Sequence, residues 1–263
     1  MSLSATLEYK LTIKDLDTSL AQIAKKPEVA RETEYYLAHI SNVKSIDDFM
    51  KDKRLVSYAM TAYGLGDLSY ATGFIRKLLQ GGIDDSSALA NKLADSKYKA
   101  FVGTFNFVRY GAATTVFTEA QQGTVDLYNR QALEKSVGDQ SEGARLALYF
   151  QRQAPTIKSS LYILADAALL KVAQTALGLS PYMSNLSIEQ QQAMIDKKLD
   201  VADLQDPAKL SKFLAKFTVL YDVQNPTTTA TNSTTALLEP INFSTPLFST
   251  DTLMSLQKLK TGR

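Results

Sequence analysis

Apolar residues recur every three or four positions along most of the chain, which is the period of an α-helix packed on one side. This pattern predicts helices at about 5–26, 28–40, 46–51, 68–80, 119–135, 141–153, 187–197 and 207–221. The stretch 106–140 is the least regular, and its β-branched and aromatic residues leave a short hairpin or a loop open there. The fold class expected from the pattern is all-α.

Two parts of the chain repeat each other. Residues 49–65 match residues 163–179 at a constant offset of 114, with a Gly-Leu pair at the end of each stretch. Such a glycine ends a helix in a left-handed conformation, and the leucine after it packs back on the helix. A second match joins 93–105 to 206–217, at an offset of 112. The aligned pairs include Asp52 with Asp166, Gly64 with Gly178, Leu65 with Leu179, Tyr98 with Leu210, Phe101 with Phe213 and Phe105 with Phe217.

This repetition predicts a multihelical single domain, 1–263, with an internal duplication. Repeat one covers about 28–107 and repeat two about 141–221. A repeat alone would leave its apolar face in water, so we expect the two repeats to be packed or intertwined and to bury each other.

The end of the chain differs in character. Residues 222–249 are rich in Thr, Asn and Pro and predict a polar connector. Residues 250–263 predict a short amphipathic helix with a stripe formed by Leu253, Leu256 and Leu259. A helix of three turns is marginal alone, so this stripe is expected to dock on the protein's own core or on a partner.

Composition narrows the function classes. The net charge of +2 is small and the basic residues are dispersed, so no electrostatic footprint for nucleic acid is present. No window is apolar enough for a membrane span, and the first residues lack the apolar region of a cleavable signal peptide. The chain has no cysteine, which excludes disulfides, thiol catalysis and zinc sites built from Cys and His. Absence of cysteine suits a reducing cytoplasm and also suits export in an unfolded state.

No residue pattern indicates catalysis, a cofactor or a metal. The single histidine, His39, has no partner identifiable from spacing that would orient it as a general base. The glycines of 64–73 do not have phosphate-loop spacing and fit two helix ends better. The acid pairs 47–48 and 84–85 are adjacent in sequence, do not share a helix face, and are interpreted as N-caps. We therefore predict a protein that is not an enzyme and has no cofactor.

Four stretches together resemble the alphaproteobacterial domain-of-unknown-function family 1217: DKRLVSYAMTAYGL (52–65), GFIRKLLQGG (73–82), ALANKLADSKYKAFVGTFNF (88–107) and LMSLQKLKTG (253–262). The resemblance implies a multihelical fold with an internal duplication, and a bacterial protein associated with the flagellum without a known activity. This chain has Ser96 and Lys97 where members of the family have two basic residues, which puts a role for a basic pair in doubt.

Two functions remain at this point. The first is a non-enzymatic structural or accessory protein of the flagellum that acts through protein–protein contacts, with flagellar components or copies of itself as partners. The second is a cytoplasmic ligand-binding or regulatory module with a pocket between the repeats. The aromatic residues expected to line that pocket are Tyr58, Tyr63, Tyr98 and Phe101.

Overall fold

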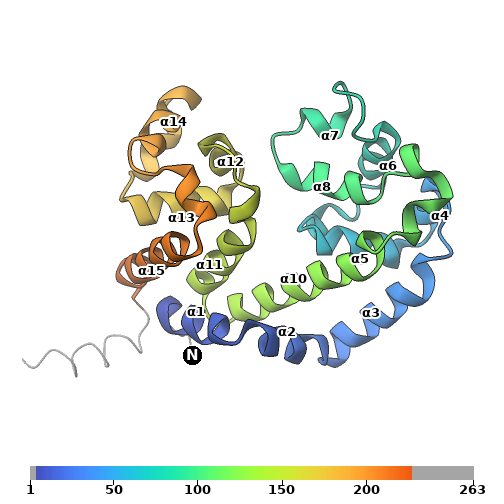
Figure 1. Ribbon diagram of the computed structural model, residues 1–263, viewed down its shortest axis with the longest axis horizontal. Helices are drawn as coiled ribbons and strands as arrows, with labels where there is room; N and C mark the ends of the chain where they lie inside the picture. Colours follow the sequence, from blue (N-terminus) through green and yellow to red (C-terminus); the bar gives the residue numbers. More distant parts are fainter. Residues whose placement is uncertain (1–3, 227–263) are drawn as a thin grey trace, which may run out of the picture.

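The computed structural model describes residues 4–226, and every regular element among them is a helix (Figure 1). The prediction of an all-α domain is confirmed. The helices form two lobes, each around its own hydrophobic core, and one further helix contributes to both cores.

The first lobe, drawn on the right of Figure 1, has a core rich in aromatic rings, including Tyr36, Phe49, Phe101 and Phe105. The α-helices around it are α3 (Pro27–Ile40), α4 (Ile46–Lys51), α5 (Lys53–Ala62), α6 (Thr72–Gly81), α7 (Leu89–Lys92), α8 (Ser96–Thr104) and α9 (Phe107–Tyr110). Short turns of other helix types, η1 (Gly66–Leu68), η2 (Gly111–Val116) and η3 (Glu119–Gly123), complete it.

The second lobe is built mainly from the later part of the chain. Its elements are α11 (Glu142–Gln153), η4 (Ala154–Thr156), α12 (Ser160–Ala165), α13 (Ala167–Leu177), η5 (Pro181–Asn185), α14 (Ile188–Asp196), η6 (Val201–Gln205) and α15 (Pro207–Gln224). The first helix of the chain, α1 (Ala5–Lys14), packs on α11 and α15 and so belongs to this lobe as well. The two ends of the described chain therefore meet in one lobe.

Helix α10 (Thr124–Gly138) joins the lobes, with α2 (Leu16–Ala24) beside it. Val125 lies in the core of the first lobe, whereas Leu133 and Val137 lie in the core of the second. Tyr128, between them, contacts both cores and stacks on Tyr58 with 3.9 Å between ring centroids. Because one continuous helix contributes to both cores, the lobes cannot separate without losing buried apolar contacts.

The two repeated stretches have the same local structure. Asp52 caps α5 by accepting hydrogen bonds from two backbone N–H groups, and Asp166 caps α13 in the same way. Gly64 and Gly178 both have positive φ, 71° and 60°. The N–H of Leu65 bonds to the carbonyl of Met60, at 2.8 Å. The equivalent bond at the end of α13, from Leu179 to Gln174, is 2.9 Å.

The order of elements is also repeated. The series α3, α4, α5, η1, α6, α7, α8 in the first lobe corresponds to α11, α12, α13, η5, α14, η6, α15 in the second. That these series arose by duplication stays a prediction.

Several expected boundaries were wrong. The stretch 106–140 contains no hairpin, because Asn106 caps α9 and the residues after it form successive helical turns. The helix expected over 5–26 is broken at Asp15, whose side chain caps α2. Neither acid of the pair 84–85 caps α7, which begins after Ala88 without a side-chain bond.

The predicted connector 222–249 also begins later than expected. Its first three residues belong to the last turn of α15, which is held because Asp222 accepts a hydrogen bond from Ser4. The rest of the connector beyond 226, and the predicted docking residues Leu253, Leu256 and Leu259, lie outside the described residues.

Candidate functional site

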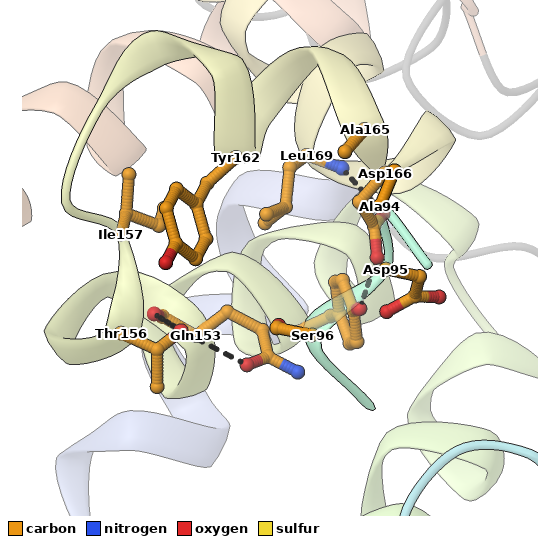
Figure 2. Close-up of a pocket in the computed structure, with 11 residues that line it drawn as sticks. Ala94, Asp95, Ser96, Gln153, Thr156, Ile157, Tyr162, Ala165, Asp166 and Leu169 are labelled. Carbon is orange, nitrogen blue, oxygen red and sulfur yellow. Dashed lines mark hydrogen bonds between the residues drawn. The ribbon is translucent and has the colours of Figure 1, made fainter. Parts of the chain in front are cut away.

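The lobes meet through polar side chains at the start of α8. Residues 94–96 of the first lobe lie beside Asp166 and Leu169 of the second, as Figure 2 shows. The void between them is about 10 Å³, and its wall is completed by residues of α11 and α12. We call Asp95, Lys97, Tyr149 and Asp166 the junction cluster.

Asp166 is the centre of the junction cluster. Its carboxylate accepts hydrogen bonds from the backbone N–H groups of Ala168 and Leu169, at 2.8 and 3.1 Å, and from the hydroxyl of Tyr149, at 2.5 Å. Burial alone would raise the pKa of Asp166, but the Tyr149 hydrogen bond and the charge of Lys97 outweigh it and lower the pKa. The carboxylate is therefore ionised at neutral pH.

Lys97 reaches across from α8 to this carboxylate. Its Nζ lies 3.1 Å from Asp166 and 3.1 Å from Asp95, which caps α8. Burial of Lys97 opposes its charge, but Tyr149, Asp166 and Asp95 together raise its pKa above the ordinary value. Lys97 is thus a fixed cation. An uncharged amine is what a nucleophilic or basic lysine needs, and this environment disfavours it.

The glycine that ends α5 makes room for the Lys97 stem. A Cβ at Gly64 would lie 3.3 Å from Lys97 Cδ and 3.1 Å from Gln131 Nε2. The positive φ of Gly64 is a second reason for glycine at this position. The equivalent Gly178 has no atom within 4 Å of such a Cβ, so only the first of the two Gly-Leu ends supports a contact between lobes.

A second group of charges lies behind the junction cluster. Glu134 on α10 is only 3% exposed and forms two hydrogen bonds with Arg152 of α11, at 2.7 and 2.9 Å. Arg130 lies 3.5 Å from the same carboxylate. The Arg152 guanidinium also lies over the Tyr149 ring, 5.1 Å from its centroid. Tyr149 thus links the two groups, and α8, α10, α11 and α13 are tied together by one polar network.

The geometry of the junction cluster suits positioning better than chemistry. A void of about 10 Å³ holds about one water molecule. Its charged groups already satisfy one another. No group of three or more His, Asp or Glu side chains in the described part of the chain is arranged to hold a metal ion. The arrangement fixes the start of α8 on the second lobe.

The residues singled out from sequence lie elsewhere. His39 is exposed on α3, where it stacks on the Tyr35 ring at 4.0 Å and bonds to the Tyr35 carbonyl. Neither acid of the pair 47–48 is the N-cap of α4, which is Ser45; Asp48 accepts a hydrogen bond from the Ser45 hydroxyl, and Asp47 pairs with Arg76. Asp84 forms an ion pair with Arg109, and Asp85 accepts a hydrogen bond from the backbone N–H of Ser87.

The four aromatic residues expected between the repeats do not line an inter-lobe pocket. Tyr58, Tyr63 and Phe101 are buried in the core of the first lobe, and Tyr98 packs edge-on against Phe74 beside that core. The apolar period correctly predicted that these residues lie on inward-facing sides of their helices. The prediction that they line a pocket was wrong, because they pack in or beside the core of the first lobe. Sequence reasoning missed the role of Lys97, whose only signal was its position just after an N-cap.

An apolar patch is exposed on the first lobe. Val108 and Tyr110 of α9, Val116 at the end of η2 and Phe117 directly after it are each more than 40% exposed. The rings of Tyr110 and Phe117 meet edge-on at 5.0 Å. The same two rings line a cleft of about 270 Å³ with Gly103, Thr104 and Glu119. We call Val108, Tyr110, Val116 and Phe117 the aromatic patch.

A cleft of about 430 Å³ lies between α10 and the helices α2 and α3. Ile23, Val29, Tyr128 and Ala132 give it apolar walls, and Lys26, Glu28, Lys135 and Asp139 are among the polar residues around it. None of the helices between residues 4 and 226 combines the length and the apolar character that crossing a membrane requires.

Comparison with known proteins gives two matches. A family model described as a protein of unknown function (DUF1217) matches residues 62–210. Among solved structures, the chain is similar to an X-ray crystal structure of a protein from Agrobacterium tumefaciens, with 46% identity and a TM-score of 0.79. The similarity covers 86% of this chain and 97% of the other. No curated protein matches the chain.

Proposed function

The chain belongs to the DUF1217 family of proteins of unknown function, and we propose that it is a non-enzymatic structural or accessory protein that acts through contacts with other proteins. The observation that carries this proposal is the aromatic patch. Two exposed aromatic rings in contact, beside a cleft and close in sequence to two further exposed apolar side chains, are typical of a protein interaction site, whereas single exposed apolar residues are ordinary. Aromatic side chains are also enriched at such sites.

The junction cluster supports the same function. Its ionised Asp166 and Lys97 are held in mutual contact, so neither is free to transfer a proton or attack a substrate at neutral pH. The polar groups at the lobe junction instead keep the lobes in one arrangement. A fixed arrangement of two lobes presents surfaces at a constant distance, which is what a scaffold requires.

The flagellum is the proposed place of action. This part of the proposal rests on the resemblance of the stretches at 52–65 and 88–107 to a family whose members are flagellum-associated. The partner would then be a flagellar component, and the stripe of Leu253, Leu256 and Leu259 remains a predicted second docking element.

Cell fractionation tests the proposal. The tagged protein is expected to travel with the basal body or the hook, and Phe117→Ser should release it because it removes half of the ring pair in the aromatic patch. Tyr70→Ser is the matched control, since Tyr70 is 81% exposed and lies outside the patch. Deletion of residues 250–263 tests the leucine stripe and should weaken the association without altering cooperative unfolding. If the Phe117→Ser variant still cofractionates, the aromatic patch is not the contact surface. If the native protein is absent from the basal-body and hook fractions, the flagellar location is refuted.

The cleft between α10 and α2–α3 favours the second candidate function. Its volume falls in the range of small-molecule sites, about 300–1,000 Å³. A ligand held there would raise the melting temperature by mass action. A thermal-shift screen with Tyr128→Ala as the control variant separates this candidate from the first, because a scaffold without a ligand shows no shift with any compound.

A further inference from the structure

The cleft of about 430 Å³ between α10 and helices α2 and α3 carries charged groups that the described chain leaves unpaired. Lys26 donates a hydrogen bond to the Ser136 hydroxyl at 3.0 Å, and neither Lys26 nor Lys135 pairs with an acid between residues 4 and 226. The carboxylate of Glu28 has no hydrogen-bond or ion-pair partner in the same range. Asp139, the C-cap of α10, offsets one of the two lysine charges. The cleft thus combines apolar walls with unpaired charges of both signs.

These charges are ordered along the cleft. The two lysines lie at the end of α10 that belongs to the second lobe, where Lys135 is in the last turn and Lys26 is held by its hydrogen bond. Glu28 lies near Tyr128, toward the first lobe, since burial and then the charges of Glu32 and Glu28 raise the pKa of Tyr128. Tyr128 and Lys135 are seven residues apart on α10, which is about 10 Å. A segment that enters from the second lobe therefore meets positive charge first and negative charge last.

Residues 250–263 have the complementary order of groups. Asp251 precedes the leucine stripe, and Lys258 and Lys260 lie at its end. Asp251 and Lys258 are also seven residues apart, so in the helix predicted for this segment they are separated by the same distance of about 10 Å. With Asp251 beside the two lysines of the cleft, the lysines of the segment reach Glu28, and the leucines between them face the apolar walls.

The chain is long enough to make this contact within one copy. Asp222 holds the end of α15 against Ser4 at the start of α1, and α1, α2 and α3 then follow one another along the lower side of Figure 1. From Ser4 to Lys26 the backbone spans at most about 45 Å. A chain of 26 residues, the length of 227–252, spans about 30 Å as a random coil and up to about 85 Å when extended. The cleft is therefore within reach of the leucine stripe of the same copy.

We propose that the leucine stripe occupies the cleft between α10 and helices α2 and α3 of its own copy. In this arrangement the apolar walls and the three leucines are removed from water together, and the charges of the segment and of the cleft are paired. Occupancy of the cleft does not depend on the aromatic patch. It rests on the proposed function in one respect: a partner that binds the leucine stripe must first displace it from the cleft, so the cleft regulates that second docking element.

Disulfide formation tests the contact, because the chain has no cysteine of its own. The full chain with Ser136→Cys and Ser255→Cys carries one thiol in the cleft and one beside the stripe. At low protein concentration it should form an intramolecular disulfide at least about tenfold faster than a control with Ser211→Cys and Ser255→Cys, because docking adds to the effective concentration that the tether alone provides. Ser211 is exposed on α15 and is closer to the stripe in sequence, so a free tether would favour the control. Equal rates in the two variants, or disulfides that join separate copies and increase with concentration, would overturn the inference.

Further substitutions in the variant with cysteines at 136 and 255 test what holds the stripe. Leu256→Ser should lower the rate of disulfide formation to that of the control, because it removes the central apolar side chain of the stripe. Glu28→Lys should slow the reaction about two- to fivefold at low salt, as expected for an exposed ion pair, and less at high salt. Glu34→Lys makes the same charge change at an exposed position of α3 outside the cleft and should leave the rate unchanged. Circular dichroism confirms that each variant is folded, and a rate that Leu256→Ser leaves unchanged would contradict the role of the stripe.

The proposed function is tested separately from this contact. Phe117→Ser, introduced into the same cysteine variant, should leave the rate of disulfide formation unchanged while it releases the protein from its partner. Loss of partner binding with normal disulfide formation in the native surface background refutes only the proposed function. Slow disulfide formation in a protein that still binds its partner refutes only the docking of the stripe.

Discussion

Replacement of Lys97 by methionine should destabilise the protein by about 1–2 kcal/mol. Exposed ion pairs contribute about 0–1 kcal/mol, whereas loss of one partner from a fully buried pair costs about 3–5 kcal/mol. The side chains of Lys97 and Asp166 are 21% and 11% exposed, which lies between these cases. Asp166 keeps its bonds to Tyr149 and to two backbone N–H groups, so the remaining carboxylate is not left unpaired. The expected loss of stability in Lys97→Met is therefore closer to the value for exposed pairs than to that for fully buried pairs.

Urea unfolding followed by circular dichroism measures this cost. The midpoint should fall, and the slope should stay unchanged because α10 contributes to both cores and keeps them in one transition. Lys99→Met is the control, since Lys99 is exposed two residues further along α8. Equal effects of Lys97→Met and Lys99→Met would refute a role for the ion pair. A lower slope or two transitions would refute the claim that α10 couples the lobes.

The stability difference between native chain and Lys97→Met should depend on pH in a defined way. The folded-state pKa of Asp166 is lowered, so its contribution is present above the ordinary value of 3.8 and is lost as the pH falls through the lowered pKa. The pKa of Lys97 is raised, so its contribution persists below its ordinary value of 10.5 and is lost only as the pH rises through the raised pKa. The difference should therefore be constant from about pH 5 to about pH 9 and should shrink in strong acid.

Further substitutions test the neighbouring features. Gly64→Ala and Gly178→Ala should each cost about 1–2 kcal/mol because both positions have positive φ. In urea, Gly64→Ala should be the more damaging, since only there does an added Cβ approach other side chains; equal losses would contradict the packing described for Lys97. Glu134→Gln should cost about 3–5 kcal/mol because it leaves the largely buried guanidinium of Arg152 without its counter-charge, and a loss below about 1 kcal/mol would mean that water compensates that charge. Gly143→Ala should lower the melting temperature, because a Cβ there would lie 2.6 Å from the Ala5 Cβ; an unchanged value would mean that α1 shifts without cost.

Local helix signals were predictable from the sequence because they act over few residues. The start of α3 at Pro27, the cap of α4 at Ser45 and the end of α13 at Gly178 all follow from the preferences of single residue types. The apolar period also placed most core residues on the correct faces. The irregular stretch was misread because β-branched and aromatic residues at 114–117 are compatible with a strand, whereas in the fold Thr115 donates to the Val43 carbonyl and the following turn, η3, packs on α3.

The junction cluster was not predictable, because it joins residues far apart in sequence. Nothing local distinguishes Lys97, which is largely buried between the lobes, from exposed Lys99 two positions later. The alignment of Asp52 with Asp166 identified two caps correctly, yet it could not show that one faces solvent and the other a second lobe. That difference depends on where α8 points, which is a property of the complete fold.

The capping of α1 by Asp222 affects the order in which a growing chain can become structured. The carboxylate accepts from Ser4 and from the backbone of Ala5 and Thr6, over more than 210 positions of sequence. On the ribosome, α1 emerges before the other described helices and must wait for α15, the last of them, before its amino end is satisfied. The aromatic core between α3 and α9 needs no residue beyond α10 and can form in the meantime. The first of the described helices to be synthesised is thus among the last to complete its hydrogen bonds.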